Sequence, residues 1–467
     1  MPWRSLLLTP LALSFSFACS SSSSTPPDDG HDPDDPDGSV DPVDDGCPAL
    51  FAQDVLPDFY VDVSQGEWAE IEDEFIHRDE RIAAGEDPTP YHPIVFRHDG
   101  DVVEDAMIRL NGASSWTEAL TFGDDPPKMQ FVISFNENNE DGRYRGRRKI
   151  GLDMPRSDWS FLRHRLGLYA LRSMGVPAQC ANNARLFVND EYFGLYTNLE
   201  RMDREILERL FPESPDGDLW KGARIIKTNE DDFTWDRLNA FWDVPESGTV
   251  ADLANMADLQ ASIEVWAAEA VLPQGDGYWA GRANFYLYDH PERGFLWMPE
   301  DLDSAFDFVE PTLDAMYPVC SGQWWEDRLH YLLVMDDPTW RGRYVEALRE
   351  KLDAYDVADM EERLDQWSAQ IAEAADADPR KVFSTGDHED AVAGLRDYFG
   401  QRAAFLDEWL ACLSDGGPDA DGDGAEMCHD CNDASRDQGP NTPETCNSID
   451  DDCDGHIDEV ADCSPEE

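Results

Sequence analysis

The stretch GDGYWAGRANFYLYDHPERGFLWMPEDLDSAFDF, residues 275–308, decides how the rest of the chain is divided. It predicts two short strands, residues 284–288 and 294–298, which interrupt an otherwise helical part of the sequence. Helical patterns extend over residues 253–272 before these strands and over residues 325–410 after them. The second half of the chain is therefore expected to be mainly helical.

The first half of the chain predicts mainly strands. Alternating or apolar runs that suit strands occur at residues 59–63, 93–96, 107–110, 128–135, 184–188 and 192–199. The last two runs meet at Asn189-Asp190, which favours a hairpin turn. Helices are expected at residues 68–75, 160–173 and 203–210, and a small-residue turn between strands at residues 111–115. Strands followed by helices predict an α+β fold with two lobes.

Polar side chains in residues 275–308 follow one another in an order that suits phosphate chemistry. Asn284 comes eight residues after Asp276, and Asp301 and Asp303 follow the second strand. Phosphoryl transfer uses one carboxylate to orient a hydroxyl, and an amide with a second carboxylate to hold Mg²⁺ against nucleotide phosphates. The stretch therefore predicts a kinase active site. The alternatives are a loop aspartate that bonds backbone amides at Asp276, and helix capping by Asp301 and Asp303.

Several blocks occur in an order that resembles the spore-coat protein H (CotH) kinase family. The blocks are IRLNGASSW, PPKMQF, RRKIGLDMPRSDWSFLRHRLGLYALRSMGVP, ARLFVNDEYFGLYTNLERMD, NFYLY and PEDLDSAFD. They cover most of residues 59–308, and the resemblance extends towards Cys412. It implies a divergent protein-kinase-like fold that binds ATP with a divalent metal and phosphorylates protein hydroxyls outside the cytoplasm.

The resemblance also implies roles for individual residues. Lys128 falls on the family's lysine that meets the nucleotide phosphates, and Asp276 falls on the catalytic-loop aspartate. Asn284 and Asp301, with Asp303 two residues on, fall on the residues that hold Mg²⁺ or Mn²⁺. The implied reaction transfers the γ-phosphate of ATP to a serine or threonine of a surface or secreted protein.

Two of the positions taken from the resemblance also have other interpretations. Lys128 alternates with apolar Met129, Phe131 and Ile133, so it also fits an ordinary solvated strand residue. Glu200 lies in a block shared with the family, where it either pairs with Lys128 or lines the nucleotide cleft. The chain contains no Gly-x-Ser-x-Gly, His-Glu-x-x-His or Walker-type motif that would indicate other chemistry.

The sequence departs from the family pattern at three positions. Glu300 replaces the tryptophan that usually precedes the metal-binding aspartate, Asp307 replaces a closing glycine, and Met129 replaces the second lysine of a pair. An added carboxylate raises the free energy of bringing triphosphate oxygens close, unless a metal ion offsets its charge. The alternative function is therefore a catalytically inactive surface binding or adhesion protein with the same fold.

The N-terminus predicts export. Residues 1–18 contain a basic residue, Arg4, followed by roughly a dozen apolar residues. These are too few to span a membrane but suit a signal peptide. Cys19 follows as the expected lipidation site. Residues 19–46 form a Ser-, Pro- and Asp-rich tether that is too poor in apolar residues to fold. The chain is expected at the cell envelope or surface, with a lipid anchor as its link to the membrane.

The composition is strongly acidic but still that of a folded protein. The 467 residues include 100 acidic and 36 basic ones, a net charge of -64, which repels nucleic acid and anionic lipid. No nucleic-acid partner is therefore expected. Hydrophobic residues make up 41% and aromatic residues 11%, which allows a sizeable core. The kinase-like domain is expected at residues 47–412.

Residues 413–467 contain two acidic repeats that predict Ca²⁺-binding loops. Their ligands are expected to be alternating aspartates around a glycine turn: Asp419, Asp421, Asp423 and Asp430 in the first repeat, and Asp450, Asp452, Asp454 and Asp458 in the second. Convincing amphipathic helices do not flank the repeats, so an EF-hand is not expected. The tail resembles a Cys-containing, acidic metal-binding repeat of exported bacterial surface proteins. The alternative is an unstructured acidic tail.

Cysteines crowd this tail. Cys428 and Cys431 flank His429 and could suggest zinc, but disulfides are expected in an oxidising compartment. Calcium and disulfides together would fold a segment that lacks a core of its own. If Cys19 carries lipid, nine of the ten cysteines remain, so at least one is free or pairs with another chain.

Overall fold

A computed structural model describes residues 46–112, 114–154, 156–222, 225–281, 283–306, 310–318, 328–447 and 449–458. The expected signal peptide, Cys19 and the tether up to residue 45 lie outside the described residues, and so does Asp307. Among the helices of the described ranges, none combines the length and the apolar character needed to span a bilayer.

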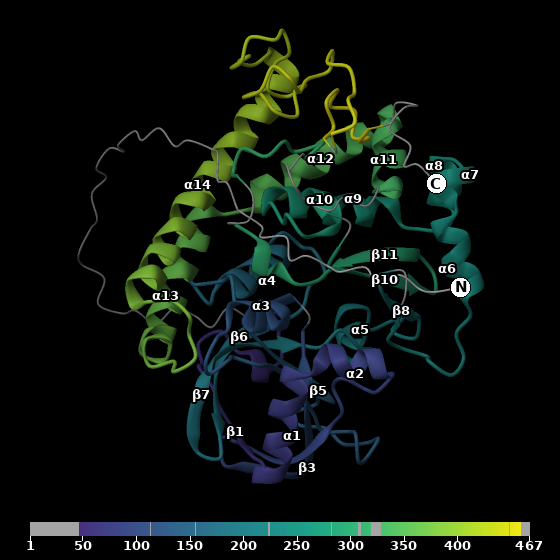
Figure 1. The fold of residues 1–467 in the computed structure, drawn as a ribbon. Coiled ribbons are helices and arrows are strands. Elements are labelled where there is room, and N and C mark those ends of the chain that lie inside the picture. The colour runs from purple at the N-terminus through teal and green to yellow at the C-terminus, as the bar shows by residue number, and fades with distance from the viewer. Residues whose placement is uncertain are drawn as a thin grey trace, which may run out of the picture. The chain divides into compact units, whose positions relative to one another are not determined.

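The strands of the first half close into a seven-stranded barrel (Figure 1). They are β1 (Asp58–Asp62), β2 (His92–His98), β3 (Asp101–Asn111), β4 (Gln130–Ser134), β5 (Lys149–Asp153), β6 (Ala181–Val188) and β7 (Glu191–Glu200). Their order is β1-β2-β3-β4-β5-β7-β6, and parallel pairing of β1 with β6 completes the ring. Phe59, Phe96 and Phe131 are fully buried in the core. The strand-rich half is confirmed, and its closure into a barrel adds to what the sequence predicted.

Most predicted strands and helices of this half lie where they were expected. The hairpin turn at Asn189-Asp190 is confirmed, with φ of +50° and +66° at the two residues. The helices are α1 (Gln65–Ile76), α2 (Arg78–Ala84), α3 (Ser114–Phe122), α4 (Arg163–Ser173) and α5 (Arg204–Leu210), and a short 3₁₀ helix, η1 (Ala49–Phe51), precedes β1. Strand β5 and helix α2 were not predicted.

The predicted small-residue turn at residues 111–115 is wrong, because helix α3 begins at Ser114. Tertiary contacts stabilise this helix. Trp116 is buried and its ring stacks on Phe75 at 5.1 Å between centroids, and its indole N–H donates to the Phe75 carbonyl at 2.5 Å. Local sequence preference for a turn is thus outweighed by burial of a large aromatic side chain.

The second half combines a small sheet with helices. Its strands β8 (Asp218–Lys221), β9 (Ile225–Ile226), β10 (Phe285–His290) and β11 (Gly294–Pro299) are arranged in the order β11-β10-β8-β9. The helices are α6 (Trp235–Trp242), α7 (Val244–Ser247), α8 (Val250–Ala254), α9 (Leu259–Val271), α10 (Tyr278–Gly281), α11 (Leu329–Asp336), α12 (Pro338–Ala354), α13 (Val357–Asp376) and α14 (Thr385–Asp415). The predicted strand pair and the helical character of this half are confirmed. Two strands that were not predicted, β8 and β9, extend the pair to a four-stranded sheet.

Helix α4 connects the two halves. Residues 163–171 of this helix are all buried, and α4 contacts β6, α13 and the 3₁₀ turn η2 (Leu302–Ser304). Gly167 allows a close approach to η2, because a Cβ atom at this position would lie 2.7 Å from Leu302 Cβ. The helix that packs on the barrel therefore also touches the turn that follows Asp301.

Disulfides join distant segments. Cys47 is bonded to Cys180, 133 residues along the chain, and the tail contains the pairs Cys412–Cys428 and Cys431–Cys453. Cys446 is also disulfide-bonded. The expectation of disulfides in place of zinc is confirmed for Cys428 and Cys431.

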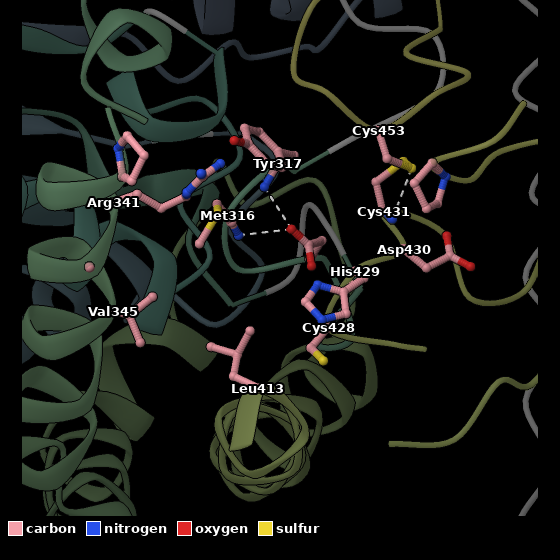
Figure 2. A pocket seen from close by; sticks show the side chains of 14 residues that line it. Met316, Tyr317, Arg341, Val345, Leu413, Cys428, His429, Asp430, Cys431 and Cys453 are labelled. Atoms are coloured by element: carbon pink, nitrogen blue, oxygen red, sulfur yellow. Dashed lines mark hydrogen bonds between the residues drawn. A yellow bond between two sulfur atoms is a disulfide. The ribbon is translucent and has the colours of Figure 1, made fainter. Parts of the chain in front are cut away.

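The tail lies against the helical half, with a pocket of about 680 Å³ at their boundary (Figure 2). The pocket is lined by helical-half and tail residues that include Tyr317, Arg341, Val345, His429, Asp430 and Cys453. Next to it the contact is tight, because a Cβ atom on Gly455 would lie 2.6 Å from Leu332 Cδ2 and 2.8 Å from Tyr317 Cδ1. The tail therefore packs closely against the helical half at Gly455 and leaves a pocket beside this contact.

The contact between α4 and η2 gives a test of the fold. Gly167→Ala places a methyl group against Leu302 Cβ, so we expect a loss of about 1–3 kcal/mol in the free energy of unfolding from overpacking. Gly400→Ala is the matched control, since Gly400 lies in α14 and a methyl group there would have nothing within 4 Å of it. That control should gain up to about 1 kcal/mol from helix propensity. Urea unfolding of both variants measures the difference, and equal stabilities would contradict this packing.

Candidate functional site

Asp276 and Asn284, which were selected from the sequence for separate roles, contact each other. Asp276 lies in the loop between α9 and α10, and Asn284 immediately precedes β10. The Asn284 Nδ2 donates to Asp276 Oδ2 at 2.8 Å. The backbone of Asn284 is left-handed, with φ of +45°, which asparagine tolerates better than most residues. Its carbonyl accepts from the Glu300 N–H at 2.9 Å, so it lies beside the residue that precedes Asp301.

Asp301 faces a histidine and a third carboxylate. His164 Nδ1, on α4, lies 3.2 Å from Asp153 Oδ2 at the end of β5 and 3.8 Å from Asp301 Oδ1. Asp301 occupies the N-terminal position of η2 with φ of +59°, but its side chain makes no capping hydrogen bond. Helix capping therefore does not account for this carboxylate. Asp153, His164 and Asp301 each offer an atom to a group within 4.8 Å, which is compact enough to hold a metal ion.

The carboxylates of this cluster are hard to ionise together. The pKa of Asp301 is raised well above its usual range by its recessed position and by the Asp303 carboxylate, although 43% of its side chain is reachable by water. Burial raises the pKa of Asp303 to about 6. Burial alone would lower the pKa of His164, but its bond to Asp153 and the charge of Asp301 raise it to about 9. Such a cluster favours a cation in its midst.

Hydrogen bonds with Glu269 and Gln274 hold the loop that carries Asp276 in place. Glu269 on α9 is fully buried, and its carboxylate accepts from the Trp279 N–H at 2.7 Å and from the Tyr278 N–H. Burial raises the pKa of Glu269 to about 8. Gln274 Nε2 donates to the Asp301 carbonyl at 2.6 Å and so joins this loop to the turn at Asp301. Asp276, Asn284 and Asp301 therefore belong to one connected site.

Lys128 is buried, so the solvated-strand interpretation is wrong. Its Nζ lies 2.5 Å from Asp378 Oδ2 and donates to the Leu195 carbonyl at 2.6 Å. The rings of Phe161 and Tyr196 lie 4.8 Å and 4.9 Å from the ammonium. Burial lowers the pKa of Lys128, and Asp378 opposes that change. The structure thus places this lysine in an enclosed ion pair between the barrel and the loop that follows α13.

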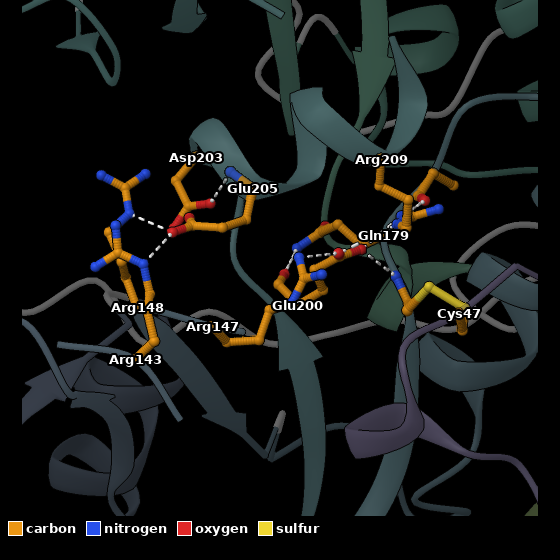
Figure 3. A network of polar contacts seen from close by, with 11 residues as sticks. Cys47, Arg143, Arg147, Arg148, Gln179, Glu200, Asp203, Glu205 and Arg209 are labelled. Atoms are coloured by element: carbon orange, nitrogen blue, oxygen red, sulfur yellow. Dashed lines mark hydrogen bonds and ion pairs between the residues drawn. A yellow bond between two sulfur atoms is a disulfide. The ribbon is translucent and has the colours of Figure 1, made fainter. Parts of the chain in front are cut away.

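Glu200 is paired with arginines (Figure 3). Its carboxylate is fully buried and lies 3.0 Å from Arg147 Nη1 and 2.5 Å from Arg209 Nη2. It also accepts from the Cys180 N–H at 3.1 Å, which ties it to the residue that forms the disulfide with Cys47. Lys128, the partner considered for Glu200 from the sequence, instead binds Asp378. Glu200 is thus part of a buried network at the end of β7.

The departures from the family pattern have partners of their own. Lys221 Nζ lies 2.9 Å from the Glu300 carboxylate, and the Tyr286 hydroxyl donates to it at 3.3 Å. The added negative charge next to Asp301 is therefore balanced by a lysine of β8. Met129 is buried, and its carbonyl accepts from the Tyr196 hydroxyl at 2.7 Å. It serves the core beside Lys128.

The first acidic repeat of the tail forms a turn with a buried aspartate. Asp419 Oδ1 and Oδ2 accept from the N–H groups of Gly422 and Gly424 at 2.6 Å and 3.1 Å. Asp430 is only 3% exposed, and its Oδ2 has no hydrogen-bond partner. Burial raises its pKa to about 6, and the charges of Asp423 and Asp421 act in the same direction. The predicted ligands of this repeat therefore lie close enough to affect one another.

The second repeat repeats this arrangement and adds a glutamate. Asp450 is only 3% exposed with an unpartnered Oδ1, and burial with the charges of Asp454 and Glu444 raises its pKa to about 7. An oxygen of Asp452 is likewise buried without a partner. Glu444 accepts from the N–H groups of Asp451, Asp452 and Asp458, so it orders the loop. Between α14 and residue 458 the described residues form turns and bends, so within them no helix follows either repeat.

Sequence reasoning missed several residues of the site. Asp153 and Glu269 carry acidic side chains at the end of a strand and within a helix, and the abundance of acids hid them. His164 lies in the helical run LRHRL, where an amphipathic pattern gives no reason to select it. Asp378 pairs with Lys128 across 250 residues, a separation that leaves no local signal.

Comparison with known proteins gives one family. The family model described as CotH kinase protein matches residues 108–406, which is more than half of the chain and includes every candidate catalytic residue named above. None of the curated proteins compared with the chain matches it.

The buried carboxyl of Glu269 gives a pH-dependent prediction. Its folded pKa of about 8 lies above the usual 4.5, so its contribution to stability is present below pH 4.5 and is lost as the pH rises to about 8. Glu269→Gln resembles the protonated form, so we expect its unfolding free energy to fall less than that of the parent between about pH 5 and pH 8. Urea unfolding at both pH values measures this.

Glu269→Ala is the second variant of this test. It leaves the N–H groups of Tyr278 and Trp279 without the side-chain oxygen that accepts from them, so we expect it to be about 1–3 kcal/mol less stable than Glu269→Gln at both pH values. Parallel pH profiles of the parent and the glutamine variant would show that the carboxyl does not titrate in this range.

Proposed function

Because the chain belongs to the CotH kinase family, we propose that it is an exported atypical protein kinase. It transfers the γ-phosphate of ATP to a serine or threonine hydroxyl of a surface or secreted protein. The observation that carries this proposal is the bond between Asn284 and Asp276, on a loop that Gln274 joins to the backbone carbonyl of Asp301, whose carboxylate caps no helix. The family match supports a divergent two-lobed kinase-like arrangement, in which the barrel and the helical half are the two lobes.

In the proposed reaction, Asp276 orients the acceptor hydroxyl. The hydroxyl oxygen bonds to the γ-phosphorus, the bond from that phosphorus to the bridging oxygen of ADP breaks, and the hydroxyl proton passes to Asp276. Burial raises the pKa of Asp276, which suits a carboxylate that accepts a proton. Asn284 keeps its carboxylate oriented. The products are ADP and the phosphorylated protein.

The carboxylates around His164 fit a divalent metal. Asn284, Asp301 and Asp303 are the proposed ligands for Mg²⁺ or Mn²⁺, and Asp153 adds a carboxylate that lies with Asp301 and His164 in a group within 4.8 Å. Bound metal would neutralise the charge of the nucleotide phosphates. The raised pKa values of Asp301 and Asp303 support a cation here, since these acids repel one another without it. His164 supplies a positive charge at one side of the cluster.

Lys128 is proposed to contact the phosphates, with Asp378 as the carboxylate that holds it. Kinases require a lysine positioned by an ion pair with an acidic residue. Asp378 also accepts from the N–H groups of Leu195 and Arg380 at 2.8 Å and 2.9 Å, so its position is fixed by both the barrel and the loop after α13. Glu200 is paired with Arg147 and Arg209, so its proposed role is to stabilise the nucleotide side of the barrel without contacting the nucleotide itself.

The tail is proposed to bind Ca²⁺ through the aspartates of its two repeats. The unpartnered, buried oxygens of Asp430 and Asp450 support this, because a buried carboxylate without a donor is costly unless a proton or a cation satisfies it. The disulfides support an oxidising compartment. Together with the N-terminal sequence they support export and a lipid anchor on Cys19.

The kinase proposal is tested on the full mature chain. Phosphate transfer from labelled ATP to a generic protein acceptor, with Mg²⁺ or Mn²⁺, should fall by about 100-fold or more in Asp276→Ala and Asp301→Ala. Asp353→Ala, at an exposed position of α12, is the matched control and should retain activity. Absence of transfer with either metal, together with no nucleotide-dependent rise in melting temperature, would instead favour the surface binding protein.

Calcium binding is tested separately by titration calorimetry. We expect Asp430→Asn to weaken the first loop and Asp450→Asn the second, each by about 10–100-fold in affinity. Asp437→Asn changes an exposed tail aspartate outside the predicted ligands and is the control. Heat signals that are unchanged by either ligand substitution would show that these repeats do not hold the ion.

A further inference from the structure

The second acidic repeat packs on the start of α11. Gly455 has φ of +94° and lies so close to Leu332 and Tyr317 that a Cβ atom would fall 2.6 Å and 2.8 Å from their side chains. Leu332 lies in the first turn of α11, where its N–H donates to the Arg328 carbonyl at 3.0 Å. The repeat therefore covers the helix end at which Arg328 is located.

Arg328 reaches from this helix end to the loop that carries Asp276. It is only 7% exposed, and its guanidinium donates to the Trp279 carbonyl. The guanidinium carbon lies 5.3 Å from the centre of the Tyr331 ring. Burial lowers the pKa of Arg328, and Asp450 is among the groups whose charge opposes this lowering. The carboxylate of the second repeat therefore lies within electrostatic range of Arg328.

Trp279 is held on both sides of its backbone. Its N–H donates to Glu269 at 2.7 Å, and its carbonyl accepts from Arg328. It lies three residues after Asp276, and the Gly281 N–H donates to the Gly277 carbonyl at 2.8 Å within the same segment. The position of Arg328 therefore affects the segment that presents Asp276.

The tail is ordered by charge more than by a core. Beside the Gly455 contact lies the pocket of about 680 Å³, so apolar packing is incomplete there (Figure 2). Asp450 Oδ1 and an oxygen of Asp452 are buried in this repeat without a hydrogen-bond partner, so a cation would satisfy both of them. Loss of a cation would therefore loosen the loop, withdraw Gly455 from Leu332, and expose the Arg328 bond to water.

We propose that Ca²⁺ in the second repeat keeps the Asp276 loop in place, through Gly455 on α11 and Arg328 on the Trp279 carbonyl. Arg328 is then a positioning residue that acts on Asp276 through Trp279. The role of the loop in phosphoryl transfer rests on the proposed kinase function. The calcium dependence of its order does not, and can be measured without catalysis.

The test is hydrogen exchange of the full mature protein, with Ca²⁺ and with EGTA. We expect Ca²⁺ to slow exchange of the amides of residues 277–281 on the order of tenfold. The variant Asp450→Asn with Asp452→Asn should lose this effect. The matched variant Asp419→Asn with Asp421→Asn alters the first repeat and should keep it. The proposal is overturned if exchange in this loop is the same with Ca²⁺ and with EGTA, or if the variants of the two repeats respond equally to Ca²⁺.

Arg328→Lys separates the positioning role from simple folding. It keeps the positive charge but loses the planar guanidinium, so Ca²⁺ should still bind the tail while the loop loses its calcium-dependent protection. If this variant fails to fold, the repeat variants above still decide the question. Phosphate-transfer assays in the same buffers distinguish the two proposals. If exchange in the loop depends on Ca²⁺ but no phosphate is transferred, the calcium coupling holds and the kinase function is wrong. If phosphate is transferred but exchange in the loop does not depend on Ca²⁺, the kinase function holds and the coupling is wrong.

Discussion

The contact between Gly167 of α4 and Leu302 of η2 determines where the candidate site forms. His164 lies three residues before Gly167, and Asp301 immediately precedes Leu302, so this contact brings His164 Nδ1 to 3.8 Å from Asp301 Oδ1. Asp153 joins them from the last residue of β5. One group thus comes from the barrel, one from the helix that spans both halves, and one from the turn after the small sheet. A larger residue at position 167 would press on Leu302 and so move Asp301 relative to His164.

Buried charges outside this site are mostly paired among the described residues, and the exceptions are informative. Lys128 is paired with Asp378, and Glu200 with Arg147 and Arg209, as expected where breaking a buried pair is strongly unfavourable. Glu269 receives backbone donors alone among its described partners, and burial raises its pKa to about 8. Asp430 and Asp450 differ because other acidic side chains surround them. A shared cation relieves such mutual repulsion better than separate protons do.

The sequence was a good guide where the signal is local. The Asn189-Asp190 hairpin and the strand pair around residue 290 depend on neighbouring residues, and both were predicted. Asp276 and Asn284 were both selected from their order in the sequence, but the bond between them was not predicted. The ion pair of Lys128 depends on packing between residues 250 apart, so no local pattern could select Asp378 from the chain's many acids. Helix α3 was missed for the same reason, since contacts of Trp116 with Phe75 decide it.

The acidic tail is physically part of the folded protein, and this changes the meaning of its charge. A tether needs no fixed contact, but Gly455 fits against Leu332 and Tyr317 with no space for a side chain. The Cys412–Cys428 disulfide joins residues 16 apart in the sequence and restricts the start of the tail. It leaves the second repeat, beyond residue 444, to be ordered by its own carboxylates, the Cys431–Cys453 bond and the disulfide of Cys446.

The disulfides and the proposed calcium loops both depend on the compartment around the protein. Disulfides form in oxidising compartments, and calcium loops of extracellular modules bind the ion weakly. On the proposal that the repeats bind Ca²⁺, the concentration of free calcium is as much a condition of the tail's order as the redox state of its cysteines. On the proposals of export and of Ca²⁺ binding, the tail would complete its fold outside the cytoplasm, and the loop that presents Asp276 would be fully ordered only there.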